Sequence, residues 1–239
     1  MIKLKMKYKK MVIAISIGTI CIGGIAYTFV NKDTGKTKSN KATQEISVTD
    51  SNFTKGTYKT ASGEMVLEKN AHPEINELVK SYFDARVACD MDKLGTLVSN
   101  IDNIQESELK SVAECVEGYE NIDCYTVDSS EEGSYVVLAY TDIKLKGIQT
   151  TAPGLTGLYV NKDDKGNYVI FNGLLSDELN AFKQNVYNCE GVKELIAYVQ
   201  DKYQEALASD ADLNKFYTQS QEDGNKTEEE PEVSTSPEP

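Results

Sequence analysis

Residues 134–146 read SYVVLAYTDIKLK, and this stretch decides the fold class of the chain. Its first half is apolar at consecutive positions and its second half alternates, which is typical of a strand that runs through a core and then leaves it. Residues 118–128, GYENIDCYTVD, alternate as a second strand. Two shorter apolar runs, 155–160 and 168–171, flank a polar turn at 161–166. Together these runs predict an antiparallel meander of about four strands.

Helical patterns lie before this meander. Pro73 suits the first turn of a helix, and the apolar residues that follow recur at helical spacing. Asp90 or Asp92 is placed to cap a second helix, and a third, short helix is expected at 106–114. The stripe of the first helix consists of Ile75, Leu78, Val79, Tyr82, Phe83 and Val87, and the second helix carries Leu94, Leu97 and Val98.

Two more helices are expected after the meander, a short one at 177–186 and a longer one at 192–208. The longer helix has an apolar face and packs over the open end of the sheet, forms a stalk, or serves as a docking surface for a partner. The last of these would require an exposed apolar stripe. The fold class predicted for the whole is α+β, with helices packed on a curved, cone-like antiparallel sheet.

The charge of the chain is unevenly distributed. Five lysines lie in residues 1–10, and every acidic residue lies after position 32. The remaining 20 basic residues face 38 acidic ones, a formal charge of −18. A body this acidic repels nucleic-acid phosphate, and the sequence contains no basic groove with interleaved aromatic residues, so nucleic-acid binding is not expected.

Residues 11–30, MVIAISIGTICIGGIAYTFV, contain no charged side chain. Twenty residues at about 1.5 Å per residue span a hydrocarbon core of about 30 Å, so this segment is predicted to be a transmembrane helix that inserts into the lipid bilayer. A cleaved signal peptide is the alternative, but no small-x-small site stands near its end. We therefore expect a signal-anchor. Cys21 is preceded by Ile20, which argues against lipoprotein processing.

Lysines on both sides of this segment set its orientation. Five precede it, whereas Lys32, Lys36, Lys38 and Lys41 follow it. The denser N-terminal cluster favours a cytoplasmic N-terminus and an extracellular body in the cell membrane. The predicted organisation is a short cytoplasmic tail (1–10), the transmembrane helix (11–30), a juxtamembrane linker (31–70) with one short strand at 64–67, a globular domain (71–217) and a disordered acidic tail (218–239).

Three stretches carry a resemblance to a known superfamily. They are HPEINELVKSYFDARVACDMDKLGTLVS (72–99), GSYVVLAYTDIKLKG (133–147) and APGLTGLYV (152–160). Over residues 72–173 the chain resembles the nuclear transport factor 2-like (ketosteroid-isomerase-like) superfamily, and it is similar to uncharacterised membrane-anchored envelope proteins of Gram-positive bacteria. The resemblance implies a curved sheet that can enclose an apolar pocket. That fold hosts isomerases, dehydratases and partner-binding modules, so it does not by itself give a function.

Isomerases of this fold use a carboxylate base and a tyrosine or a protonated acid in the pocket. The residues that could play these roles are Asp123, Asp142, Tyr125, Tyr135 and Tyr140, and strand alternation points Asp142 outward. Nothing in the sequence brings them into one pocket. No catalytic residue is therefore assigned.

Other reactive side chains are few. His72 is the only histidine and is expected to cap a helix or lie on the surface, and Arg86, the only arginine, is expected to form a surface ion pair. The turn NKDDKG lacks the oxygen ligands of a calcium loop, so no metal or cofactor is assigned. Four cysteines of the body either stay as thiols or form disulfides; Cys115–Cys124 and Cys89–Cys189 are pairs to consider.

The sequence therefore predicts a membrane-anchored, extracytoplasmic, non-catalytic binding or scaffold module of a bacterial envelope, with an envelope protein or a small apolar ligand as its partner. The alternative is a small membrane-bound isomerase- or dehydratase-like enzyme that uses the cavity of the cone. A sheet whose interior is filled by side chains argues against this alternative, whereas a buried acid beside a tyrosine hydroxyl favours it.

Overall fold

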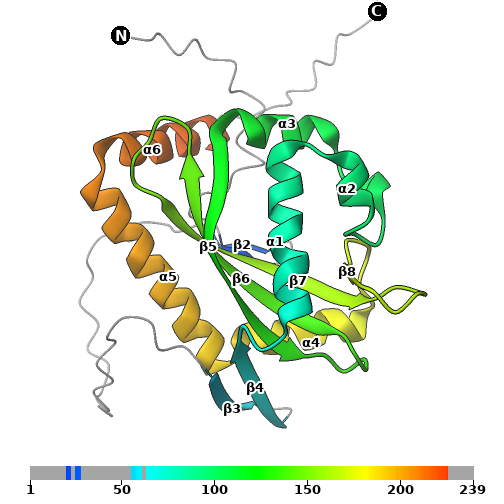
Figure 1. Cartoon of the computed structure of the whole chain (residues 1–239). Helices are drawn as coiled ribbons and strands as arrows, with labels where there is room; N and C mark the ends of the chain where they lie inside the picture. Colours follow the sequence, from blue (N-terminus) through cyan, green and yellow to red (C-terminus); the bar gives the residue numbers. More distant parts are fainter. Residues whose placement is uncertain (1–19, 23–24, 28–54, 61–62, 226–239) are drawn as a thin grey trace, which may run out of the picture.

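A computed structural model describes residues 20–22, 25–27, 55–60 and 63–225, and these form a mixed α+β fold (Figure 1). The bounds of the elements are β1 (Ile20–Ile22), β2 (Ile25–Tyr27), β3 (Lys55–Thr60), β4 (Gly63–Lys69), α1 (Pro73–Ala88), α2 (Met91–Gly95), η2 (Ile101–Asn103), α3 (Glu106–Cys115), β5 (Val116–Asp128), β6 (Tyr135–Leu145), β7 (Ala152–Lys162), β8 (Tyr168–Ile170), α4 (Asp177–Asn188), α5 (Glu190–Ser209) and α6 (Ala211–Asn225).

The described strands form one sheet in the order β2-β1-β7-β6-β5-β4-β3, with β8 beside the end of β7. From β3 to β8 every neighbouring pair is antiparallel, which confirms the predicted meander. The three long strands at its centre supply most of the pairing, and β1 meets β7 in parallel at Cys21 and Thr156.

Apolar residues at consecutive positions of β6 are explained by cover on both faces of the sheet. Val136 and Leu138 point to one face and Val137 and Ala139 to the other, and all four are fully buried. Two-sided burial is more usual in parallel sheets with helices on both faces. Here helices also cover both faces, as Figure 1 shows for α1 on one side and for α4 and α5 on the other.

The first face of the sheet is covered by α1, α2 and α3. Proline at the first position of α1 costs no hydrogen bond, because that N–H has no partner within a helix. Asp90 caps α2 by accepting a hydrogen bond from the backbone N–H of Lys93 at 2.9 Å. The side chains of Ile75, Val79 and Leu94 are 0% exposed and pack on β5, β6 and β7. The predicted first and third helices are confirmed. The second is shorter than predicted, because α2 ends at Gly95 and leaves Leu97 and Val98 outside it.

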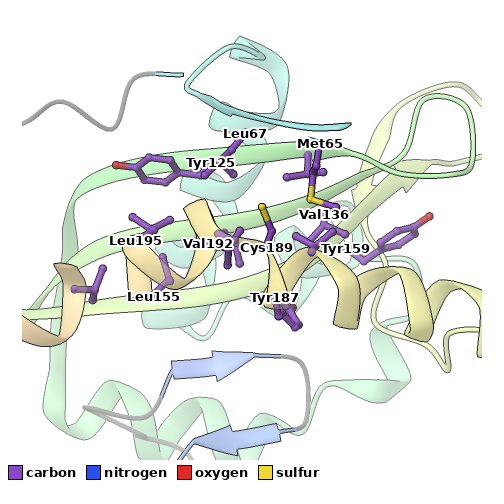
Figure 2. Close-up of a cluster of buried hydrophobic side chains, with 14 of the residues drawn as sticks. Met65, Leu67, Tyr125, Val136, Leu155, Tyr159, Tyr187, Cys189, Val192 and Leu195 are labelled. Carbon is purple, nitrogen blue, oxygen red and sulfur yellow. The ribbon is translucent and has the colours of Figure 1, made fainter. Parts of the chain in front are cut away.

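The second face is covered by α4 and α5, which place Val186, Val192 and Leu195 against the apolar side chains of β4 to β7 (Figure 2). Each fully buried aliphatic side chain of this kind contributes about 1.5–3 kcal/mol. The long C-terminal helix is therefore not a stalk. Its outer face is polar, with Lys193, Glu194, Asp201, Gln204 and Glu205 exposed, so the expected docking stripe is not found.

A third apolar cluster closes the end of the sheet where β5 begins and β6 ends. Tyr203 and Leu207 of α5 and Leu213 of α6 pack there against Val116 and Leu145. Leu213 is 0% exposed, so α6 belongs to the folded body.

The structure differs from two of the segments predicted from the sequence. The range 31–70 is not all linker, because β3 and β4 form a hairpin that joins the sheet at β5. The folded body therefore extends further towards the N-terminus than residue 71. The range 218–239 is not all tail, because α6 continues to Asn225. Residues 226–239 lie outside the described residues.

Six residues of the predicted membrane segment are described, Ile20–Ile22 and Ile25–Tyr27, and they form the two short antiparallel strands β1 and β2. The rest of residues 11–30 lies outside the described residues, as do residues 1–10. Among the described helices, none combines the length and apolarity needed to cross a bilayer. The transmembrane helix thus stays a prediction from the sequence.

Candidate functional site

Four of the five candidate acid–base residues lie together on β5 and β6. Asp123 is the cross-strand partner of Tyr140, and Tyr125 lies opposite Leu138. Asp142 follows Tyr140 by two positions, so both side chains lie on the same face of β6. We call Asp123, Tyr125, Tyr140 and Asp142 the tyrosine–aspartate cluster.

A β-bulge in β5 shapes this cluster. The pairing register shifts by one residue between Glu120 and Asp123, and Asn121 at the bulge has a φ of 49°. Asparagine tolerates this left-handed conformation better than most residues. Its side-chain Nδ2 donates a hydrogen bond to Asp142 at 2.8 Å. The bulge therefore brings an amide donor onto the second aspartate.

Asp142 also accepts a hydrogen bond from the Tyr140 hydroxyl at 2.7 Å. The carboxylate is half-buried and both of its oxygens are engaged. The expectation that it points outward holds in part, because the face of β6 that bears Tyr140 and Asp142 is only partly covered at this end of the strand.

Asp123 is held from the neighbouring strand. Lys69 at the end of β4 places its Nζ 2.8 Å from one carboxylate oxygen, and Asn70 donates to the other at 2.7 Å. The Lys69 ammonium also lies 5.7 Å from the centre of the Tyr125 ring. Both aspartates of the cluster therefore have amide donors, and one has a lysine.

Burial raises the pKa of both tyrosines in the cluster. For Tyr140, the hydrogen bond to Asp142 and the negative charge of that carboxylate raise the pKa further. For Tyr125, the charge of Asp123 adds to the effect of burial. Both phenols hence stay protonated at neutral pH, and the proton of Tyr140 is already donated to Asp142. The Tyr140 hydroxyl and the Asp142 carboxylate are therefore hydrogen-bonded to each other in the absence of a ligand.

The position of the cluster differs from that of a cone cavity. Figure 2 shows Tyr125 and Tyr159 at opposite ends of the apolar cluster under α4 and α5, with their hydroxyls pointing away from it. Tyr198 of α5 influences the pKa of both Tyr125 and Tyr140, so it lies beside them. The acids thus lie on the α5 face, whereas a cavity of the expected kind would lie between α1 and the sheet. Apolar side chains such as Val79 fill that space.

Tyr135, the fifth candidate, lies on the α1 face at the other end of β6. The centre of its ring is 4.6 Å from that of His72 and 5.9 Å from that of Tyr168. We call His72, Tyr135 and Tyr168 the aromatic ledge. His72 occupies the N-cap position of α1 but its side chain makes no capping hydrogen bond, so its ring packs and does not cap.

Arg86 forms no ion pair with any carboxylate in the described part of the chain, so the expected surface ion pair is wrong. Its guanidinium donates a hydrogen bond to the Tyr82 hydroxyl at 3.0 Å and lies over the Tyr82 ring. Tyr82 stands four residues earlier, on the same face of α1. Arg86 lies in the last turn, where a positive charge also suits the helix dipole.

None of the four body cysteines forms a disulfide. Cys89 packs with the core of the α1 face and Cys189 with the core of the α5 face, so the sheet separates them. The structure therefore supports thiols, the first of the two alternatives. Burial, aided by the charge of Asp123, raises the pKa of the Cys124 thiol to about 12, which suppresses its reactivity.

The turn at 161–166 joins β7 to β8, as predicted. One carboxylate oxygen of Asp163 accepts hydrogen bonds from the backbone N–H groups of Lys165 at 2.9 Å and Asn167 at 2.8 Å. These bonds lower the pKa of Asp163. Within residues 20–225, as far as they are described, no three His, Cys, Asp or Glu side chains are grouped to hold a metal ion.

Sequence reasoning found the two aspartates and two tyrosines but missed the side chains that hold them, Lys69, Asn70, Asn121 and Tyr198. Lys69 and Asn70 lie at and just after the end of β4, Asn121 lies at the bulge of β5, and Tyr198 lies on α5. The approach of the first three depends on strand register and on the bulge. No local sequence pattern marks them.

In three separate comparisons, the chain matches no family model, no curated protein and no solved structure.

Proposed function

We propose that this chain is a membrane-anchored, extracytoplasmic binding or scaffold module of a bacterial envelope, and that it has no catalytic activity. The observation that carries this proposal is the way the body is filled. Buried apolar side chains occupy both faces of the sheet, and Asp123, Tyr140 and Asp142 are hydrogen-bonded to protein groups. A rigid, filled body suits recognition at its surface.

The anchor in this proposal comes from the sequence. Residues 11–30 carry no charge and follow five lysines, so the bilayer is the first partner of the chain. The second partner is an envelope protein or a small apolar ligand. The acidic body, at −18 in formal charge, disfavours nucleic acid.

The order of the elements supports the proposed place of residues 72–173 in the nuclear transport factor 2-like superfamily. Three helices precede an antiparallel meander, and α1 packs across the sheet. One additional link ties the opening helices to the end of the meander, because Val98 pairs with Ile170 as an isolated bridge. The α4–α6 layer is extra to that unit.

Labelling of one engineered cysteine in living cells tests the location of the body. Lys165 is exposed at the tip of the β7–β8 turn, and Cys89 is the one described body cysteine that is not buried. A chain with Lys165→Cys and Cys89→Ser is expected to react with a membrane-impermeant maleimide in intact cells as fully as after lysis. The Cys89→Ser chain alone reports background. Reaction confined to lysed cells would overturn the proposal.

A second candidate function is an isomerase- or dehydratase-like enzyme, and the hydrogen bond between Tyr140 and Asp142 is the observation that favours it. Enolisable ketones in heavy water provide a test, because a working carboxylate base exchanges their α-protons for deuterium. We expect no exchange above the solvent rate. Exchange that is lost in Asp142→Asn but kept in Asp210→Asn would establish the enzyme instead.

A further inference from the structure

The aromatic ledge brings together three rings from three separate elements. His72 precedes α1, Tyr135 begins β6 and Tyr168 begins β8, and all three side chains are partly exposed. The rings touch in a row, with neighbouring centres 4.6 and 5.9 Å apart. Their mutual tilts of 52° and 66° leave no single flat surface for stacking against a planar ligand.

The electrostatic surroundings of the ledge are negative. The carboxylate of Glu68 lies 4.0 Å from the His72 ring nitrogen. Burial raises the pKa of Tyr135 to about 12, the hydrogen bond and proximity to Tyr168 raise it too, and the charges of Asp128 and Glu68 raise it further. Aromatic rings beside carboxylates attract cations, because the faces of the rings are themselves negative.

One ammonium group already lies on this surface. Lys162 places its Nζ 5.1 Å from the centre of the Tyr168 ring. Within the described residues, no lysine or arginine lies over the rings of Tyr135 or His72. The contact of Lys162 with Tyr168 therefore shows that a ring of the ledge accepts an ammonium group.

A lysine-rich segment precedes the described residue Lys55 in the sequence. The described chain resumes at Lys55 after residues 28–54, and Lys55 is the cross-strand partner of Glu68. Residues 32–41 contain four lysines and one aspartate. The chain between Lys41 and Lys55 reaches at most about 45 Å when extended, so the segment is tethered within range of the ledge.

We propose that the lysine-rich segment 32–41 of this chain docks on the aromatic ledge, with its ammonium groups against the rings of Tyr135 and His72. Charge complementarity favours this contact, because a segment of positive charge meets a body of strongly negative charge. The tether makes the contact intramolecular, which raises its effective concentration. Docking would hold the His72 end of the body towards the membrane.

His72 provides a direct probe, because it is the only histidine in the chain and gives one set of ring resonances. The test compares the full chain in detergent micelles with a variant that carries Lys36→Gln, Lys38→Gln and Lys41→Gln. We expect the chemical shifts of the His72 ring to change in this variant. A matched control with Lys93→Gln, Lys193→Gln and Lys215→Gln removes three exposed lysines elsewhere and is expected to leave them in place.

Salt and dilution complete the test. At about 0.5 M ionic strength the screening length falls to roughly 4 Å, so the resonances of the unmodified chain are expected to move towards those of the Lys36/Lys38/Lys41 variant. Identical resonances in that variant and the unmodified chain would overturn the proposal. A shift that disappears on dilution would overturn it as well, because it would place the lysines of a second copy on the ledge.

Discussion

At the scale of single residues, two buried phenols stand out. The hydroxyls of Tyr187 and Tyr203 are buried and have no hydrogen-bond partner in the described part of the chain. A buried polar group without a partner costs about 1–3 kcal/mol. Both rings are otherwise well packed. Tyr187 of α4 lies in the core of the α5 face, and Tyr203 of α5 packs against Tyr217.

Removing either hydroxyl should therefore stabilise the protein. We predict that Tyr187→Phe and Tyr203→Phe each raise the free energy of unfolding by about 1 kcal/mol, because the apolar ring stays while the unpaired group is lost. Urea denaturation followed by circular dichroism measures the change. Tyr140→Phe is the control, since that hydroxyl donates to Asp142 and its loss should destabilise. Destabilisation of the first two variants would show that their hydroxyls have partners after all.

The residue scale also shows where prediction from sequence stopped. Asp123, Tyr125, Tyr140 and Asp142 were recognisable as residue types suited to acid–base chemistry, but nothing in the sequence brought them together. Their meeting across β5 and β6 depends on the bulge at Asn121. The position of the bulge is not marked in the sequence, because it is fixed by the pairing of β5 with β6 and not by a local pattern.

At the scale of elements, one side chain just after β8 strengthens the link between this strand and the loop after α2. Asn172 accepts hydrogen bonds from the Ser99 hydroxyl and the Asn100 backbone N–H, both at 3.0 Å, and donates to the Asn100 carbonyl at 2.7 Å. It joins the short final strand to the loop after α2, 73 positions away in the chain. A three-residue strand has few ladder bonds of its own.

Asn172→Ala should therefore loosen this junction locally. We predict a loss of about 1–3 kcal/mol, because three hydrogen bonds are removed and their partners are partly exposed to water. Hydrogen exchange should accelerate at the amides of Ser99 and Ile170 and stay unchanged at the centre of β6. Asn180→Ala, which loses one bond to a backbone carbonyl, serves as control. Uniform acceleration over the whole sheet would contradict a local role.

The last helix gives a second prediction at this scale. Leu213 of α6 is fully buried against α5 and the end of the sheet. We predict that Leu213→Ala costs about 2–5 kcal/mol through lost burial and the cavity it leaves. Gln219→Ala, at an exposed position of the same helix, should cost little. Equal, small effects in thermal unfolding would mean that α6 is not docked.

Elements were predictable where their apolar residues recur often enough to fix a period. The helices at 73–88 and 190–209 and the strands of the meander meet this condition. The short strand predicted at 64–67 is part of β4. The strand β3 and the helix α6 were not predicted, because they are mostly polar and few of their residues, such as Leu213, reach the core. Tertiary packing decides such elements, and that information is spread over the whole chain.

At the scale of the whole molecule, the protein should lose stability in alkali. Burial raises the pKa of Cys124 from 9.0 to about 12, and it raises the pKa of Tyr125, Tyr140, Tyr187 and Tyr203 above 10.0. Above these ordinary values the unfolded chain releases protons that the folded chain retains, so the free energy of unfolding falls as pH rises.

We predict full stability from these groups below pH 9.0, the ordinary value of a thiol, and a progressive loss up to about 12 as the unfolded thiol and phenols ionise. Urea midpoints measured between these limits provide the check. The double variant Tyr187→Phe/Tyr203→Phe should show a shallower slope, because two of the shifted groups are gone. A flat profile would mean that the buried phenols and the Cys124 thiol ionise as easily in the folded protein as in the unfolded chain.

The two-sided cover of the sheet has a consequence for biosynthesis. The strands that bear Met65, Leu67, Val136, Leu138 and Leu155 are complete once residue 162 has been made, yet the helices that cover these side chains end only at residue 209. Until α4 and α5 have been made, the apolar side chains on their face of the sheet are exposed to solvent. A nascent chain arrested between these points presents a large binding surface for a molecular chaperone, and one cut there by a protease should aggregate.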